Sequence, residues 1–311
     1  MGVALTTLLF GPTGQVGWEL RRALNPLGKL ISLDRHERGG LRGDLTDLDA
    51  VAAAIRTVKP GVIINAAAYT AVDAAESEPE QARLINATAP GVMAEVAREH
   101  NALLVHYSTD YVFDGSGQQP WREDDPTSPL NVYGQTKREG EEAIRVVDGN
   151  HLIFRTAWVY AARGYNFIRT MIRLACERDE LKVIDDQHGA PTGAELIADV
   201  TAHAVRTAVM RPELRGIYNL TAAGETTWYG YARFVIEQAR AAGVPVRVEP
   251  DAIEAVTTDT FPTAACRPKN SRLDCHKLET TFGLTRPDWR IGVARALEEM
   301  DLPQQKGKSD R

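Results

Sequence analysis

Three glycines in one short turn, Gly11, Gly14 and Gly17, constrain the fold of this chain more than any other feature. They follow an apolar run at residues 7–10 and precede a helical pattern at residues 16–27. In a strand–turn–helix unit, the first glycine allows the tight turn, the second lets a pyrophosphate approach the backbone, and the third allows close helix packing. Three glycines alone also occur in ordinary turns. Their place between a strand and a helix favours a dinucleotide site.

Short apolar runs alternate with longer helical patterns over the first half of the chain. The pattern predicts strands at residues 7–10, 30–33, 61–65, 103–106 and 152–155, and helices at residues 16–27, 48–58, 79–100 and 133–147. Such alternation is typical of an α/β fold whose parallel sheet has helices on both faces. The sequence therefore predicts a Rossmann-type, doubly wound parallel sheet.

The second half of the chain is less regular. We expect helices at residues 167–178, 193–209 and 227–242, strands at 181–184 and 216–220, and a proline-rich stretch at 250–268. This pattern predicts a dinucleotide-binding domain over residues 1–150, to which segments near 185–215 return. A smaller, discontinuous C-terminal substrate lobe would occupy mainly residues 151–300, and the polar tail at 304–311 would fray.

Composition narrows the class of partner. The formal net charge of −6 argues against nucleic acid, whose binding proteins usually carry a basic stripe. No stretch approaches the roughly 20 apolar residues that a membrane-spanning helix needs. The three cysteines are odd in number and lack metal-binding spacing. A protein of the reducing cytoplasm, without a membrane partner, is the expectation.

A tyrosine and a lysine four residues apart, Tyr133 and Lys137, are candidate catalytic residues. Residues at i and i+4 share one helix face, so both side chains would line one pocket wall. A phenol with an ordinary pKa near 10 is a poor acid–base catalyst at neutral pH. We expect the Lys137 ammonium to favour the phenolate and to lower the pKa of Tyr133. The ordinary alternative is an exposed tyrosine beside a solvated lysine.

A hydroxyl residue follows the fourth predicted strand, at the sheet edge where ligands bind in open α/β folds. Thr109 is placed to hydrogen-bond a substrate carbonyl oxygen, and Ser108 is an alternative for that role. Either hydroxyl could instead bond its own backbone in a turn. The nearby Tyr133 and Lys137 favour the catalytic interpretation.

Acidic residues follow the second strand. Asp34 stands about 20 residues after the glycine turn, where a ribose-binding carboxylate is expected, although it could be a solvent-facing residue at a strand end. An acid there favours NADH, whereas Arg35 could hold the 2′-phosphate of NADPH, so the preference stays open. Asp44 could accept the adenine amino group or cap the following helix. Farther along, Arg267 could pair bidentately with a diphosphate or be an ordinary surface arginine.

These residues resemble the extended short-chain dehydrogenase/reductases and, within them, the dTDP-4-dehydrorhamnose reductase family. The similarity runs from the first strand to about residue 300. The segments that carry it are GPTGQVGWEL at 11–20, NAAAYTAVD at 65–73, STDYVFDG at 108–115, NVYGQTK at 131–137, FRTAWVY at 154–160, GAPTG at 189–193 and RPKNSRL at 267–273. Many families share the glycine turn, and the later segments are more specific.

The resemblance implies a reaction, in which NAD(P)H reduces the C4 ketone of dTDP-4-dehydro-β-L-rhamnose to give dTDP-β-L-rhamnose, a precursor of cell-surface polysaccharide. Tyr133 would donate the proton, Lys137 would hold the nicotinamide ribose, and Thr109 would bind the C4 oxygen. Asp110 and Trp158 would contact the sugar. The residues expected around the cofactor are Gly11, Gly14, Gln15, Val16, Gly17, Asp34, Asp44, Leu45, Ala68, Tyr69, Thr70, Tyr107, Tyr133 and Lys137.

The resemblance also bears on assembly. Members of the family can form homodimers, in some cases bridged by Mg²⁺ through glutamates, and Glu19 and Glu195 match those positions. Exposed glutamates on helices are usually only solvated.

Two other functions share this pattern. A nucleotide-sugar epimerase or dehydratase of the same fold would use the same tyrosine and lysine, so only its product separates it from a reductase. A non-catalytic subunit, similar to the regulatory subunit of methionine adenosyltransferase, would keep the fold and the dinucleotide site. The joint presence of Thr109, Tyr133 and Lys137 favours an enzyme.

Overall fold

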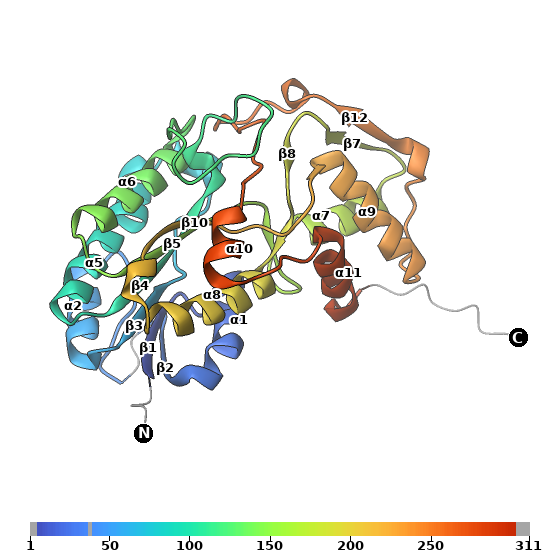
Figure 1. The fold of residues 1–311 in the computed structure, drawn as a ribbon. Coiled ribbons are helices and arrows are strands. Elements are labelled where there is room, and N and C mark those ends of the chain that lie inside the picture. The colour runs from blue at the N-terminus through green and yellow to red at the C-terminus, as the bar shows by residue number, and fades with distance from the viewer. Residues whose placement is uncertain (1–4, 37–38, 303–311) are drawn as a thin grey trace, which may run out of the picture.

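The computed structural model describes residues 5–36 and 39–302. Its centre is a six-stranded sheet with the order β10–β5–β4–β3–β1–β2, in which every neighbouring pair is parallel (Figure 1). The strands are β1 (Leu5–Phe10), β2 (Gly28–Leu33), β3 (Val62–Asn65), β4 (Leu103–Thr109), β5 (His151–Thr156) and β10 (Gly216–Asn219). The chain changes direction across the sheet between β1 and β3, which is where open α/β sheets bind ligands. The predicted doubly wound parallel sheet is confirmed.

Helices cover both faces of this sheet. Successive strand residues point to opposite faces, and Leu8 and Leu9 accordingly belong to different cores. One face packs against α2 (Leu48–Val58), α5 (Ala89–Glu99) and α6 (Val132–Val146). The other packs against α1 (Gln15–Ala23), α8 (Ala194–Ala208) and α10 (His276–Phe282). Strands buried on both faces need continuous apolar runs, which explains the runs at residues 8–10 of β1, 62–64 of β3 and 152–154 of β5.

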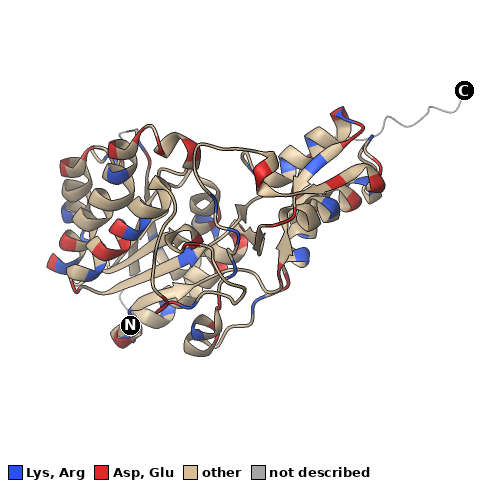
Figure 2. Ribbon diagram, turned by 90° about the horizontal axis from the view of Figure 1, so that it is seen from above, with Lys and Arg blue, Asp and Glu red and all other residues tan. Residues whose placement is uncertain are grey.

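A second core lies beside the sheet (Figures 1 and 2). It is formed by α7 (Phe167–Glu177), α9 (Trp228–Ala241), α11 (Trp289–Glu299) and a parallel pair of strands, β7 (Leu181–Ile184) and β12 (Ile253–Val256). Buried Tyr231 and Trp289 meet edge to face at its centre, with ring centroids 5.8 Å apart. The short strands β6 (Val159–Tyr160), β8 (His188–Gly189), β9 (Thr192–Gly193) and β11 (Thr226–Thr227) make two further pairs. In Figure 2, the positions of acidic and basic residues alternate along the helices.

Two helical predictions needed correction. The first helix ends at Ala23, and a 3-10 turn (Asn25–Leu27) follows it, because Pro26 has no N–H to continue the helix. The helix expected at residues 79–100 consists of α4 (Pro79–Arg83), a π-helical turn (Leu84–Thr88) and α5. Pro90 cannot donate to the carbonyl of Asn86, four residues earlier, which frees that part of the helix to widen.

The proline-rich stretch at residues 250–268 contains one regular element that the sequence analysis missed, strand β12, whose Ile253 pairs with Leu181 of β7. The remaining short elements are α3 (Val72–Ala75) and the 3-10 turns Asp110–Val112, Pro212–Leu214, Pro250–Ala252 and Thr258–Thr260. Within residues 5–36 and 39–302, none of the helices has the length and apolar character to span a membrane. The tail expected to fray, residues 304–311, lies outside the described residues.

Candidate active site

The carboxyl end of β4 and the first turn of α6 bring the predicted catalytic side chains together. The Asn131 side chain caps α6 by accepting a hydrogen bond from the N–H of Gly134 at 2.8 Å. The helix then passes very close to the turn after β4, because a Cβ on Gly134 would lie 2.1 Å from the carbonyl oxygen of Tyr111. Only glycine permits this approach, and it sets Tyr133 beside the end of β4.

The Lys137 side chain is buried and hydrogen-bonded to strand β4. The side chain is 2% exposed, so the solvated-lysine alternative is wrong. Its Nζ donates to the carbonyl oxygen of Tyr107 at 2.6 Å and lies 3.1 Å from Nε2 of His106. Burial lowers the pKa of Lys137 to about 8, although the Glu141 carboxylate opposes this change.

His106 connects the lysine to the neighbouring strand β3. Its Nδ1 lies 3.2 Å from Nδ2 of Asn65, the residue opposite it in the sheet. The Oδ1 of Asn65 accepts the N–H of Ala67 at 3.2 Å. Burial, together with the charge of Lys137, holds the pKa of His106 well below its usual value, so the imidazole is neutral. Two strand ends are thus linked behind the candidate site.

The expected lowering of the Tyr133 pKa is wrong for this arrangement. Burial raises the pKa of Tyr133 to about 12, the Asp110 carboxylate adds to the rise, and the Thr109 hydroxyl opposes it. The Lys137 Nζ is meanwhile engaged with β4. Tyr133 is therefore a neutral phenol, which is the form that can donate a proton.

Thr109 lies on the Tyr133 side of β4. Ser108 and Thr109 point to opposite faces of the strand. The Thr109 hydroxyl is the one that lowers the pKa of the Tyr133 phenol through hydrogen bonding. Its Oγ1 also donates to Oδ1 of Asp110 at 3.0 Å and accepts the N–H of Tyr111 at 3.2 Å, so the local turn bonding is present as well. Burial raises the pKa of Asp110 to about 6. Among the described residues, the hydroxyl of Ser108 has no hydrogen-bond partner.

In the glycine turn, Gly11 and Gly17 are required for close backbone packing, whereas Gly14 has room above it for a ligand. Gly11 has φ of 78°, and a Cβ there would lie 2.7 Å from the N atom of Ala67. A Cβ on Gly17 would lie 1.9 Å from the carbonyl oxygen of Gly11. A Cβ on Gly14, by contrast, would meet only that oxygen, at an ordinary 3.7 Å. Gly14 opens α1 with no side-chain cap, so the free N–H groups there fit a pyrophosphate.

The acids after β2 differ in their surroundings. Asp34 is 9% exposed and its Oδ1 accepts the N–H of His36 at 2.8 Å, so it is not the solvent-facing residue of the alternative interpretation. Asp44 does not cap α2, because Asp47 does so by accepting the N–H of Ala50 at 3.0 Å. The capping alternative for Asp44 is therefore wrong. Leu45, next to it, is buried among the residues that cover the sheet.

The segment after β3 is clamped by a residue that the sequence analysis missed. Asn86, in the π-helical turn, is fully buried and accepts the N–H of Tyr69 at 2.9 Å while donating to its carbonyl at 3.0 Å. It also donates to Oγ1 of Thr136 on α6 at 3.2 Å. Ala68 and Thr70, on either side of Tyr69, are exposed. A polar amide inside a long helical pattern was the signal that could have identified Asn86.

The remaining predicted cofactor residues lie around the turn and the strand. The Oε1 of Gln15 accepts a hydrogen bond from Nδ2 of Asn166 at 3.3 Å, which ties the turn to the chain before α7. Val16 packs half-buried against the sheet. The hydroxyl of Tyr107 lies 2.8 Å from Oγ1 of Thr201 on α8, so only its backbone faces Lys137.

Trp158 has an unusual backbone, with φ of 50°, and its half-buried ring stacks on Trp228 at a centroid distance of 3.8 Å. A Cβ on Gly189 would lie 2.7 Å from the Trp158 ring, so a glycine is required beneath it. Positive φ in a bulky residue persists only where the surroundings enforce it, which is common at ligand sites. Arg267 is half-buried and pairs with Asp73, its Nη2 lying 2.7 Å from Oδ2.

A buried ion pair behind Lys137 was also missed. Glu141 lies one turn after Lys137 on α6, and its carboxylate pairs in bidentate fashion with Arg155 of β5 at 2.9 and 2.7 Å. Both side chains are at most 4% exposed. Arg155 also donates to the carbonyl of Glu123 at 3.0 Å and lies over the ring of Phe113. The pair fixes α6 against the sheet, since a buried charge without its partner is costly.

Comparisons with known proteins agree with this geometry. The family model of the RmlD substrate binding domain matches residues 5–302. A dTDP-4-dehydrorhamnose reductase of Escherichia coli is 55% identical over 296 residues, which cover 95% of this chain and 98% of the relative. A dTDP-4-dehydrorhamnose reductase from Bacillus anthracis, solved in complex with NADP, superposes with a TM-score of 0.84 at 31% identity, covering 96% of this chain and 100% of that one.

This chain belongs to the dTDP-4-dehydrorhamnose reductase family.

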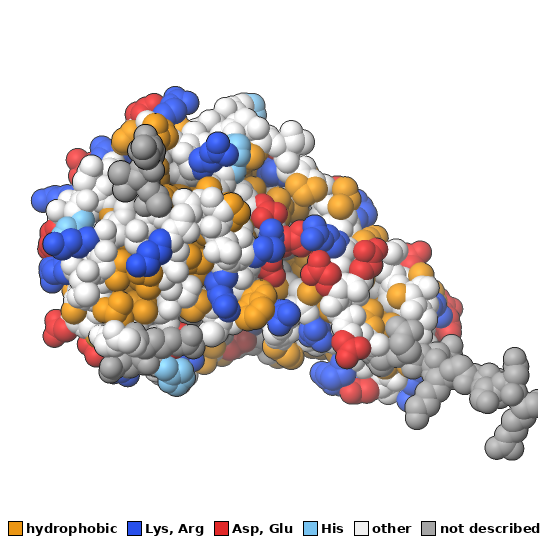
Figure 3. All heavy atoms as spheres, turned by 90° about the horizontal axis from the view of Figure 1, so that it is seen from below, with side chains coloured by type: hydrophobic (Ala, Val, Ile, Leu, Met, Phe, Trp, Pro, Cys, Tyr) orange, Lys and Arg blue, Asp and Glu red, His pale blue; other side chains and the backbone are white. Residues whose placement is uncertain are grey.

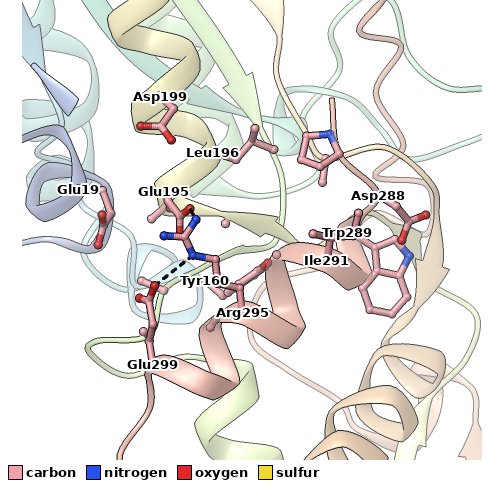
Figure 4. A pocket seen from close by; sticks show the side chains of 18 residues that line it. Glu19, Tyr160, Glu195, Leu196, Asp199, Asp288, Trp289, Ile291, Arg295 and Glu299 are labelled. Atoms are coloured by element: carbon pink, nitrogen blue, oxygen red, sulfur yellow. Dashed lines mark hydrogen bonds and ion pairs between the residues drawn. The ribbon is translucent and has the colours of Figure 1, made fainter. Parts of the chain in front are cut away.

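In this member of the family, Glu19 and Glu195 line a cavity of about 210 Å³ between α1, α8 and α11 (Figure 4). Arg295 lies among the acids of the cavity, with its Nη1 2.6 Å from Oε1 of Glu195 and its Nε 3.2 Å from Oε1 of Glu299. Figure 3 shows charges of both signs gathered where the two parts of the molecule meet. Among the described residues, no three His, Cys, Asp or Glu side chains form a metal-binding group. Glu195 and Glu299 thus pair with Arg295, and Glu19 pairs with Arg22, whose Nε lies 3.3 Å from Oε2 of Glu19.

Proposed function

We propose that this chain catalyses the NAD(P)H-dependent reduction of the C4 ketone of dTDP-4-dehydro-β-L-rhamnose, which gives dTDP-β-L-rhamnose. The observation that carries the proposal is a neutral phenol, Tyr133, next to the Thr109 hydroxyl and one helical turn from the buried Lys137. These groups lie at the carboxyl edge of a sheet whose first turn fits a dinucleotide. The similar proteins from Escherichia coli and Bacillus anthracis are named for this reductase activity.

Each catalytic side chain has one task in the proposed reaction. Tyr133 donates its proton to the oxygen that forms from the ketone, and the Thr109 hydroxyl holds that oxygen. Lys137 has three N–H donors when protonated, of which two point to Tyr107 and His106. The third is available for the nicotinamide ribose. When bound, the reduced nicotinamide supplies the hydride equivalent.

We assign the cofactor to the glycine turn and the segments around it. Gly11, Gly14 and Gly17 shape the pyrophosphate site, with Gln15 and Val16 between them. Asp34 would bind a ribose hydroxyl, and the exposed Arg35 would bind the 2′-phosphate of NADPH. We therefore propose that the enzyme uses both NADH and NADPH. The other contacts proposed for the cofactor are Asp44, Leu45, Ala68, Tyr69, Thr70 and Tyr107. Asp110, Trp158 and Arg267 would bind the substrate.

Three broader proposals accompany this function. Residues 1–150 would bind the dinucleotide, and residues 151–300 would mainly bind the sugar nucleotide. The three cysteines are free thiols, which fits a cytoplasmic enzyme. The chain would form a homodimer. A Mg²⁺ at Glu19 and Glu195 would require Arg295 to release Glu195, and it stays a prediction for the dimer.

A spectrophotometric assay tests the proposal. Purified protein is mixed with dTDP-4-dehydrorhamnose and either NADH or NADPH, and the sugar product is identified. We expect both cofactors to be oxidised and dTDP-β-L-rhamnose to form. A different sugar product without net cofactor oxidation would indicate an epimerase or dehydratase. Tight cofactor binding without any turnover of the keto-sugar would indicate a non-catalytic subunit.

A further inference from the structure

An ion pair joins two loops that are far apart in the sequence. Arg267 lies in the loop before α10, and Asp73 lies on the short helix α3 that follows β3, 194 residues earlier. The guanidinium grips the carboxylate in bidentate fashion, with Nη2 2.7 Å from Oδ2 and Nη1 3.2 Å from Oδ1. The N–H of Ala265 also donates to Oδ1, at 3.1 Å.

The donors around Asp73 are those that a phosphate group takes. Phosphate oxygens bind the planar fork of an arginine together with backbone N–H groups of a loop. The loop at residues 263–267 offers both, and it orients its arginine internally, because Nη1 of Arg267 also donates to the carbonyl of Ala265 at 3.1 Å. The Asp73 carboxylate therefore lies in a ready-made anion site.

This anion site borders the candidate active site. The carbonyl of Cys266 accepts a hydrogen bond from Nδ2 of Asn131, the cap of α6, at 2.6 Å. The charges of Arg267 and Asp73 both act on the pKa of Tyr111. The Tyr111 ring in turn meets the Tyr133 ring edge to face, with centroids 5.6 Å apart. An anion bound by Arg267 would thus lie within reach of a sugar held at Tyr133.

We propose that Asp73 occupies the phosphate subsite of the enzyme from within, so that a nucleoside diphosphate must displace its carboxylate from Arg267 in order to bind. The inference rests on the proposed function, in which Arg267 binds the diphosphate. Asp73 is then a specificity-determining residue. A ligand with two adjacent phosphates can compete with a bidentate carboxylate, and an uncharged sugar cannot.

Equilibrium binding of dTDP, measured by titration calorimetry, tests the inference. Asp73→Asn keeps the size of the side chain and removes the competing charge, so we expect dTDP to bind about three- to tenfold more tightly. Arg267→Gln should weaken dTDP binding. In the double variant, the gain from Asp73→Asn should disappear, because no guanidinium remains to be released.

Asp186→Asn is the matched control. Asp186 also ties loops of the C-terminal half, accepting from Nζ of Lys269 at 3.0 Å and from the N–H of Thr258 at 2.8 Å, and its contacts do not include Arg267. Its loss should leave dTDP affinity unchanged. NADH affinity should be the same in all variants, which shows that they fold. Asp73→Ser repeats the test with a side chain too short to replace the carboxylate.

Weaker or unchanged dTDP binding in both Asp73 variants would overturn the inference, since Asp73 would then only orient Arg267 or have no role. The binding assay needs no turnover, so the two proposals fail separately. Tighter dTDP binding in a protein that never reduces the keto-sugar would keep the inference and remove the proposed activity. Normal turnover in the wild type, with unchanged dTDP affinity in the Asp73 variants, would support the proposed activity and overturn the inference.

Discussion

Replacement of Lys137 by methionine tests the burial of its ammonium through stability alone. The folded chain holds Lys137 with a pKa of about 8, against an ordinary 10.5, and the first cause is burial. Below about pH 8 both the folded and the unfolded chain carry the proton, and the full cost of the buried charge is present. Between about pH 8 and 10.5 only the unfolded chain keeps the proton. The stability of the wild type must therefore rise with pH across this window.

The magnitude follows from the two pKa values. The difference between 10.5 and about 8 corresponds to about 3–4 kcal/mol in total, at about 1.4 kcal/mol per pKa unit. Lys137→Met lacks the titrating group, so other titrations cancel in the comparison. From about pH 7 to about pH 10, the free energy of unfolding of the wild type should rise by about 2–3 kcal/mol relative to that of the variant.

Urea denaturation of both proteins across this pH range measures the difference. Lys182→Met is the control, because Lys182 is exposed and pairs with Glu254 at the surface. Its difference from the wild type should stay constant within about 0.5 kcal/mol. A similarly flat difference for Lys137→Met, or one that falls with pH, would refute the argument that burial governs this lysine.

Three further sets of substitutions test the glycine turn of the cofactor site, the buried Glu141–Arg155 ion pair and the proposed sugar contact of Trp158. Gly14→Ala should change the free energy of unfolding by less than about 1 kcal/mol, yet weaken NADH binding at least about tenfold. Gly17→Ala should destabilise the fold, because its Cβ would lie 1.9 Å from a backbone oxygen. Urea denaturation measures the stability of both variants, and titration calorimetry measures their NADH affinity. Glu141→Gln should lower the free energy of unfolding by about 3–5 kcal/mol, while Glu254→Gln at an exposed pair should cost less than about 1 kcal/mol; equal losses would contradict the role of burial. Trp158→Ala should raise the KM for the keto-sugar about two- to tenfold and leave that for NADH nearly unchanged, as steady-state kinetics would show.

The sequence was sufficient for the parts of the molecule governed by local pattern. Apolar runs such as those of β3 and β5 are typical of strands buried on both faces of a parallel sheet. Gly11, Gly14 and Gly17, placed between a strand and a helix, favour a dinucleotide-binding turn. The i, i+4 spacing of Tyr133 and Lys137 likewise places both on one face of α6.

The interactions that the sequence did not predict all join distant segments. The pairing of Glu141 with Arg155, the clamp of Asn86 on Tyr69 and the bridge from Asp73 to Arg267 depend on tertiary contacts that no local pattern encodes. The prediction of a lowered pKa for Tyr133 was wrong for the same reason. Spacing alone suggested that the lysine charge would dominate, but burial and Asp110 raise the value instead.

Tyr133→Phe tests in one experiment whether the Tyr133 hydroxyl is the proton donor. The variant retains the ring that packs edge-on against Tyr111 and loses only the hydroxyl. With dTDP-4-dehydrorhamnose present, we expect NADPH oxidation to fall at least about 100-fold while NADPH binding stays within about twofold of the wild type. NADPH oxidation at the wild-type rate in this variant would contradict the role of Tyr133 as the proton donor.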